Sequence, residues 1–258
     1  MKHTITNHKF ASRTSALPAA LIGAALLATA GSPAFAGNGN AGNPNIMPPQ
    51  SHPYGLSYAE WAESYWQWAH SFPTTANPAN GTAPPESAQS GSVWFLASAP
   101  FSPVPGAATA RNISIPAGTS LFAPASSFFN NNQALPEDTT FTEEELLEQA
   151  NDIWDGLAVR TECYVDGVKV KGLENPQETA YFVETELFSV TVADHDNVFA
   201  GDGVLDGETV DEVAVGAFLM IKPLKVGKHT VRLVGAIEPA PGFVLTKDVT
   251  YTVTVVAQ

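Results

Sequence analysis

Residues 249–255 read Val-Thr-Tyr-Thr-Val-Thr-Val, and this stretch decides the class of fold. Large apolar side chains alternate with threonines along its whole length, which is the period of a strand with one buried and one exposed face. Apolar runs at 182–192, 213–221 and 229–234 have the length and composition of further strands. The C-terminal half of the chain is therefore predicted to be rich in β-structure.

Turn signals separate other short strands along the chain. Asp166-Gly167 is a dipeptide suited to a two-residue hairpin turn, and apolar runs lie on both sides of it at 159–165 and 168–170. Nearer the N-terminus, 93–97 is a short apolar run, and two more surround the turn at 116–118. Many short strands with frequent turns are typical of an antiparallel β-sandwich or jelly roll.

Two segments instead show the period of a helix. Ser57 and Glu60 form a capping box ahead of aromatic residues spaced by three and four, and Pro73 ends the segment. Thr142 and Glu145 form a second capping box, which begins a helix with an apolar face from Leu146 to Leu157. The sequence thus predicts a mainly β fold decorated by two amphipathic helices.

The first 36 residues have the three parts of a secretory signal peptide. Lys2, Lys9 and Arg13 precede an apolar run at 16–30, and the small residues at 32–36 provide a cleavage site after Ala36. The apolar run is shorter than the roughly 20 residues of a membrane-spanning helix, so no stable membrane anchor is expected. The predicted destination is the periplasm or the cell exterior.

The predicted chain has three parts: the signal peptide at 1–36, a flexible mature N-terminus at 37–53 and a single β-rich domain at 54–258. The part at 37–53 is dominated by Gly, Asn and Pro.

The mature chain is strongly acidic. Cleavage leaves all 26 Asp and Glu but only nine of the 12 Lys and Arg. Such a charge repels polyanions, so nucleic acid is excluded as a partner. The one cysteine, Cys163, lies in a predicted strand, where we expect a buried and inert thiol rather than an intermolecular disulfide.

Several motifs are similar to those of a group of secreted bacterial proteins that have no assigned activity. They include Tyr58-Ala59-Glu60-Trp61 with Trp66-Gln67-Trp68-Ala69, and Val93-Trp94-Phe95-Leu96. They also include Pro116-Ala117-Gly118 with Leu121-Phe122, and Lys222-Pro223-Leu224 ahead of Gly227-Lys228-His229-Thr230. The resemblance extends from about Tyr54 to the C-terminus. It implies export and a single fold, and it assigns no chemistry.

The aromatic helix suggests one candidate binding surface. Trp61 and Trp68 lie on its apolar stripe, where packing in the core is the expected role. Trp66 lies on the flank among polar neighbours, and with Gln67 and His70 it forms a candidate ligand-binding set. For His70 the alternative is a favourable interaction with the negative end of the helix dipole.

Acidic loops in the C-terminal half suggest a second candidate site. Asp194, Asp196, Asp202 and Asp206 provide the oxygen ligands that calcium prefers, although their spacing is not that of an EF-hand. The alternative is a solvated acidic loop. His195 between two of these acids also permits a transition-metal site, but a continuous tripeptide rarely encloses an ion.

Three functions remain open at this stage. The first is an exported, non-catalytic protein that binds an extracellular polymer or a protein partner. The second is a secreted hydrolase or lyase acting on a polymer through a pair of carboxylates. The third is a surface or matrix component stabilised by calcium. The sequence contains no nucleophile elbow of the form G-x-S-x-G, a motif that would favour the second function.

Overall fold

The computed structural model describes residues 43–104, 106–132 and 140–257, with the side chain of Asp202 left out. The predicted signal peptide at 1–36 and the first part of the predicted flexible N-terminus, 37–42, lie outside the described residues. The described residues belong to one compact unit.

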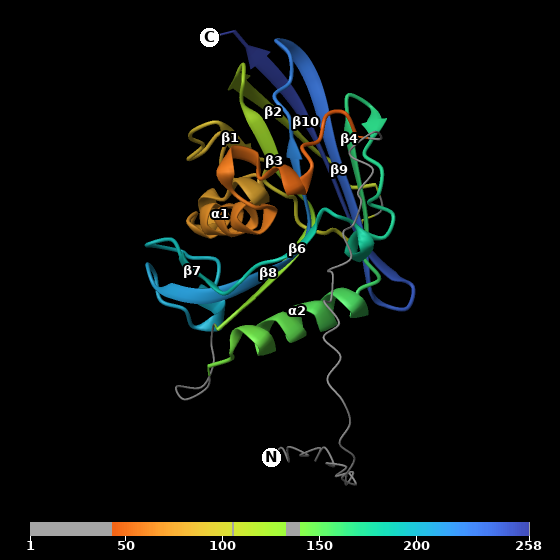
Figure 1. Ribbon diagram of the computed structural model, residues 1–258. Helices are drawn as coiled ribbons and strands as arrows, with labels where there is room; N and C mark the ends of the chain where they lie inside the picture. The colour runs from red at the N-terminus through yellow and green to blue at the C-terminus, as the bar shows by residue number, and fades with distance from the viewer. Residues whose placement is uncertain (1–42, 105, 133–139, 258) are drawn as a thin grey trace, which may run out of the picture. The chain divides into compact units, whose positions relative to one another are not determined.

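Two five-stranded sheets form this unit (Figure 1). In the first, the order is β1-β3-β8-β6, with β7 also paired to β8. Its strands are β1 (Val93–Phe95), β3 (Ser120–Asn131), β6 (Phe182–Glu184), β7 (Phe188–Thr191) and β8 (Thr209–Ile221). In the second, the order is β2-β10-β9-β4-β5. Its strands are β2 (Thr109–Pro116), β4 (Arg160–Val165), β5 (Val168–Lys169), β9 (Gly227–Ala240) and β10 (Phe243–Val256).

This architecture confirms the predicted mainly β sandwich with two helices. The alternating stretch that predicted it is the C-terminal part of β10, where Val249, Tyr251 and Val253 are fully buried. Each sheet also contains one parallel pair, β1 with β3 and β2 with β10, so the sheets are mixed rather than purely antiparallel. Parallel pairing here joins strands that are distant in the sequence, which the local pattern of alternation does not reveal.

Both predicted helices form, each with its capping box. In α1 (Tyr58–His70) the Ser57 hydroxyl accepts a hydrogen bond from the Glu60 amide, and the Glu60 carboxylate accepts one from the Ser57 amide. The same exchange between Thr142 and Glu145 begins α2 (Glu143–Gly156). Six 3-10 helices complete the elements: η1 (Pro49–Ser51), η2 (Pro53–Gly55), η3 (Thr74–Ala76), η4 (Pro78–Asn80), η5 (Pro176–Glu178) and η6 (Ala200–Asp202).

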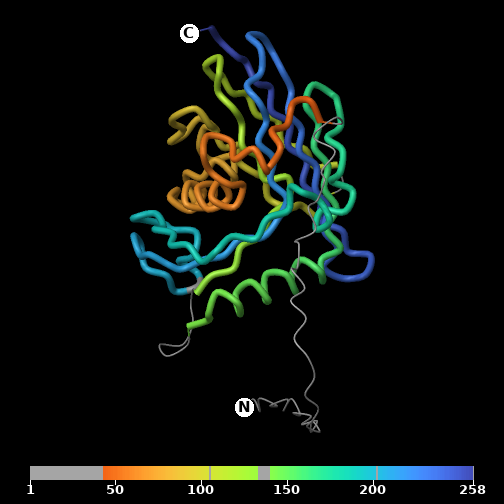
Figure 2. Tube along the Cα trace, in the orientation of Figure 1, coloured from red at the N-terminus to blue at the C-terminus, as the bar shows by residue number. Residues whose placement is uncertain are grey.

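The two helices pack on β3 and β8 through different aromatic clusters. On α1, Tyr58 and Tyr65 contact Phe122 and Phe218, which stack on each other with centroids 5.4 Å apart. On α2, Trp154 contacts Phe128 of β3, and Leu146 and Ala150 are fully buried with it. Figures 1 and 2 show α1 and α2 on opposite sides of the curved β7–β8 ribbon. No helix among the described residues is long and apolar enough to cross a bilayer.

Part of the predicted flexible N-terminus is instead built into the fold. Residues 45–47 pair with the C-terminal end of β8: Ile46 forms a bridge with Ile221 and is 1% exposed. The Met47 amide donates to the Met220 carbonyl at 2.8 Å. One buried isoleucine and backbone pairing thus order a segment whose composition predicted flexibility.

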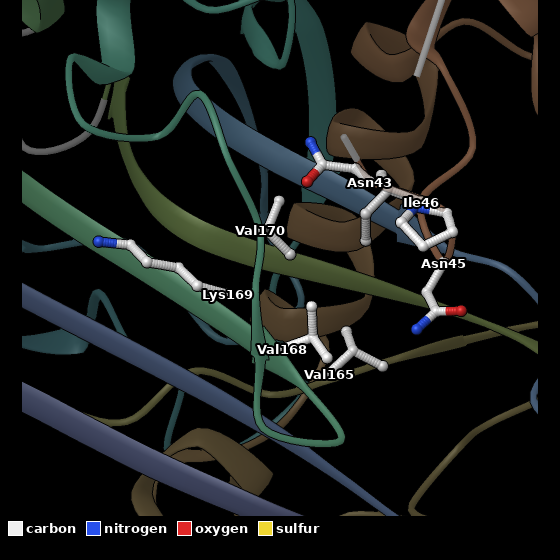
Figure 3. A pocket seen from close by; sticks show the side chains of 8 residues that line it. Asn43, Asn45, Ile46, Val165, Val168, Lys169 and Val170 are labelled. Carbon is white, nitrogen blue, oxygen red and sulfur yellow. The ribbon is translucent and has the colours of Figure 1, made fainter. Parts of the chain in front are cut away.

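A small pocket lies between this segment and the β4–β5 hairpin (Figure 3). Val165, Val168 and Val170 line it on the hairpin side, and Asn43, Asn45 and Ile46 line it on the other. The figure shows the Lys169 amine pointing away from these valines, and this amine donates to Glu162 at 2.7 Å. The space inside accommodates about one water molecule, so we assign no ligand to it.

Two cationic side chains are buried inside the sandwich. Arg111 on β2 donates to the Ala97 carbonyl and the Tyr251 hydroxyl, each at 2.7 Å. Lys247 on β10 is 4% exposed, and its amine donates to the Ser98 hydroxyl at 3.1 Å. Gly235 on β9 faces Lys247, and a Cβ at that glycine would lie 2.7 Å from the lysine Cε. The missing side chain at Gly235 therefore makes room for the lysine stem.

Burial lowers the pKa of Lys247 to about 8, which gives a pH-dependent cost to folding. Below pH 8 the amine is charged in both states, and the folded state bears a desolvation cost of roughly 3 kcal/mol. As the pH rises from 8 to the unfolded-state value near 10.5, this cost disappears. We therefore expect Lys247→Met to raise the free energy of unfolding at pH 7 and to give a shrinking gain toward pH 10.5.

Denaturant unfolding of both proteins at several pH values measures this gain, with the exposed Lys225→Met as control. A gain for Lys247→Met that does not change between pH 7 and 10.5 would contradict the assignment.

Candidate functional site

The C-terminal end of α1 contains a buried acid–base pair. His70 Nδ1 lies 3.2 Å from Glu212 Oε2 of β8, and the two side chains are 5% and 0% exposed. The distance is that of an ion-pair contact, but the direction of the imidazole nitrogen does not satisfy a hydrogen bond to the carboxylate. Asn131 on the neighbouring strand β3 donates its amide to the same carboxylate oxygen at 3.2 Å.

Aromatic rings enclose this pair. The ring centroids of Phe129 and Phe199 lie 4.7 and 4.8 Å from that of His70, both in edge-to-face geometry. Trp66, one turn earlier on α1, lies 5.1 Å from His70 and 4.8 Å from Phe129. Of the residues predicted to bind a ligand, His70 is therefore buried and Trp66 is half-buried against it.

Three polar atoms of this neighbourhood are buried without a hydrogen-bond partner among the described residues: Trp66 Nε1, His70 Nδ1 and Glu212 Oε1. A buried polar group without a partner costs free energy. The Glu212 carboxyl group is fully buried, and the His70 imidazole lies directly beside it. We call His70, Glu212 and Trp66 the buried polar centre.

The acidic loop after β7 is fastened to the end of α1. The Ala193 amide donates to the His70 carbonyl at 3.2 Å, and the Thr74 amide donates to the Asp196 carbonyl at 2.8 Å. Gln67, the third residue of the predicted binding set, is exposed and donates to the Ser189 carbonyl of β7 at 3.1 Å. The predicted ligand-binding residues and the acidic loop are thus neighbours in space.

The carboxylates of the predicted calcium site have separate partners. Asp194 contacts its neighbour His195 at 2.6 Å, and Asp196 accepts a hydrogen bond from the Thr75 amide at 3.0 Å. Asp206 accepts two from Asn197, and these bonds lower the pKa of its carboxyl group. The side chain of Asp202 lies outside the description. Within the described part of the chain, no three acidic, His or Cys side chains gather as a metal site.

A second feature lies at the other end of α1. An open groove with a volume of about 340 Å³ separates the start of the helix from the segment before β1. Its size falls in the range of small-molecule sites. Its lining is formed by Tyr54, Trp61, Ser90, Gly91, Ser92, Val93 and Phe95.

The aromatic wall of this groove is held in place by hydrogen bonds. Tyr54 is 47% exposed, and its hydroxyl is 2.9 Å from the Ser120 hydroxyl. The Trp61 indole donates to the Pro53 carbonyl at 2.9 Å, and the Tyr54 and Trp61 rings meet edge to face at 6.3 Å. Tyr54 also has a left-handed backbone, with φ 58°.

Tyr54 and Glu212 were not among the residues singled out from the sequence. Tyr54 precedes the helical pattern and has no periodicity of its own. Glu212 follows Asp211 in what reads as an acidic approach to a strand, yet the register of β8 with β3 directs it into the core. Trp61, which was predicted to lie in the core, is partly buried against the hydrophobic core and also lines the groove.

The buried polar centre predicts a strong coupling between His70 and Glu212. In His70→Phe the fully buried Glu212 carboxyl group loses the imidazole beside it, and we expect a loss of about 1 to 3 kcal/mol in the free energy of unfolding. Adding Glu212→Leu removes the buried carboxyl group that has lost its neighbour, so the double variant should be more stable than His70→Phe. Denaturant unfolding of both single variants and the double variant measures the coupling. Additive losses would show that the two side chains act independently.

Comparisons with models of protein families, with curated proteins and with solved structures found no match for this chain.

Proposed function

We propose that the chain is an exported, non-catalytic binding protein that takes a neutral polysaccharide of the periplasm or cell exterior in the groove of Tyr54 and Trp61. The observation that supports this most directly is the exposed, rigidly held aromatic wall of the groove. Export is proposed from the signal-peptide pattern at 1–36.

The chemistry of the lining favours a sugar. The faces of pyranose rings present C–H groups that pack on aromatic side chains, while their hydroxyl groups need hydrogen-bonding partners. The groove offers both kinds of contact, because Ser90 and Ser92 are exposed opposite Tyr54 and Trp61. An aromatic wall facing polar groups is the usual composition of a ligand site.

The charge of the protein favours a neutral polymer. Acidic residues outnumber Lys and Arg by 26 to 12 in the full chain, which repels anionic polysaccharides. The groove segment itself is uncharged, since residues 87–96 contain no acidic or basic side chain. Affinity for a neutral ligand in such a groove should therefore depend only weakly on salt.

A binding experiment on the mature chain tests the groove. Titration calorimetry with a panel of neutral oligosaccharides should find a ligand whose affinity falls at least tenfold in Tyr54→Ala, a loss of about 1.4 kcal/mol. The control is Phe243→Ala, which truncates a 51% exposed aromatic residue on the β9–β10 hairpin. Melting curves of both variants distinguish loss of the site from loss of the fold.

Three results would contradict the proposal: no binding across the panel, a ligand that binds Tyr54→Ala as well as wild type, or turnover of an oligosaccharide.

Export has a separate test. Native protein recovered from its producing cells should lack the mass of residues 1–36 and begin at Gly37, because the cleavage site follows Ala36. Intact-mass spectrometry of the periplasmic and extracellular fractions measures this. An uncleaved chain that remains in the cytosol would exclude the proposed location without bearing on the groove.

A further inference from the structure

Strand β2 ends the second sheet with one free edge. Its eight residues pair in parallel with β10, from Thr109 opposite Val249 to Pro116 opposite Val256. In such a ladder alternate residues direct their N–H and C=O groups to the partner, and the others direct theirs away. In the described ranges, no strand and no backbone hydrogen bond occupies the opposite edge of residues 110–115. Figure 1 shows β2 next to β10.

The other strands that end the two sheets are much shorter. In the first sheet the three-residue strands β1 and β6 and the four-residue strand β7 lie at the edges, and the two-residue strand β5 ends the second sheet on its far side. In the described ranges β3 also extends past β1 from Ala123 to Asn131 without a strand partner on that side, but its residues there are buried or half-buried. Natural proteins protect long edges with outward lysines, bulges or prolines. On β2 the proline is the last residue, the register with β10 has no bulge, and the exposed side chains are Ala110, Asn112 and Ser114.

Arg111 does not protect this edge. An inward charge on an edge strand disfavours pairing when a new strand would remove that charge from water. Arg111 is only 7% exposed already, and its guanidinium donates to the Ala97 and Ala79 carbonyls and the Tyr251 hydroxyl. Adding a strand beside β2 would therefore remove little further hydration from it.

The charge distribution favours a second copy of the chain as the occupant. Copies of an acidic protein repel each other over most of their surface. However, the sequence from 87 to 136 contains no acidic residue, and Arg111 is its one basic residue. The free edge lies within this stretch, so two copies can approach there with the least electrostatic cost.

We propose that β2 pairs antiparallel with β2 of a second copy around a two-fold axis. The second sheet of one copy and the second sheet of the other then form one continuous sheet. A strand is complementary to its own copy in this arrangement. Each backbone N–H that one copy directs outward meets a backbone carbonyl of the other copy, and the two-fold axis repeats the bond in reverse. Contact along one strand is small compared with stable dimer interfaces, so the dimer is weak and depends on concentration. This association does not depend on the proposed ligand.

Sedimentation equilibrium of the mature chain tests the proposal. We expect a monomer–dimer equilibrium whose dissociation constant rises at least tenfold in Asn112→Lys, which places two like charges across the axis. The matched control is Thr230→Lys, because Thr230 is exposed on the same face but lies on β9, two strands from the edge. Its dissociation constant should stay within about twofold of wild type.

Cysteine cross-linking gives an independent measurement. Side chains opposite each other across an antiparallel pair are about 4.5 to 5.5 Å apart, so under mild oxidation Asn112→Cys, which faces its own copy across the axis, should give a disulfide-linked dimer. Thr230→Cys should give none. The native thiol gives no background because Cys163 is fully buried and burial raises its pKa to about 12.

Two results would overturn the proposal. One is a single monomeric mass from about 10 µM to 1 mM, a range that covers weak association. The other is a dimer whose contact lies away from the edge of β2. Equal weakening by Asn112→Lys and Thr230→Lys would show this, and so would cross-linking through Thr230→Cys alone.

Discussion

The structure depends on the contact between the aromatic face of α1 and the strands β3 and β8. Tyr58 connects three parts of the chain: its hydroxyl donates to the Met47 carbonyl at 2.6 Å and accepts from the Met220 amide at 3.0 Å. Its ring packs on Phe122, which stacks on Phe218. This one helix therefore fixes the N-terminal segment, covers the first sheet and positions both candidate features, since the groove lies at its start and the buried polar centre at its end.

Much of this arrangement follows from local sequence rules. Both capping boxes form at the predicted residues because they involve only neighbours along the chain. The burial of Val249, Tyr251 and Val253 follows directly from alternation. What local rules do not contain is which strands pair. The parallel partners β2 and β10 are more than 130 residues apart in the sequence, so nothing in either strand alone indicates the other.

The same limit explains why the surroundings of the candidate site residues could not be predicted from the sequence. The helical period places Trp66 on a polar flank of α1, but Phe129 of β3 packs on Trp66, and Phe199 of the loop after β7 packs on its neighbour His70. Periodicity describes one helix and not what folds over it. Conversely, Trp61 lies on the apolar stripe and packs on Phe95 and Phe122 of the first sheet, yet it also lines the groove. Pairing of β8 with β3 and β7 then decides that Glu212 is buried.

The position of β10 has a consequence for biogenesis. The last strand of the chain is not at the margin of its sheet but between β2 and β9, with long ladders to both. A nascent chain that lacks β10 cannot form this sheet, because β2 and β9 each pair with β10. Pairing between strands that are distant in the sequence is also slow. This sheet can therefore close only after β10 has been synthesised and has inserted between β2 and β9.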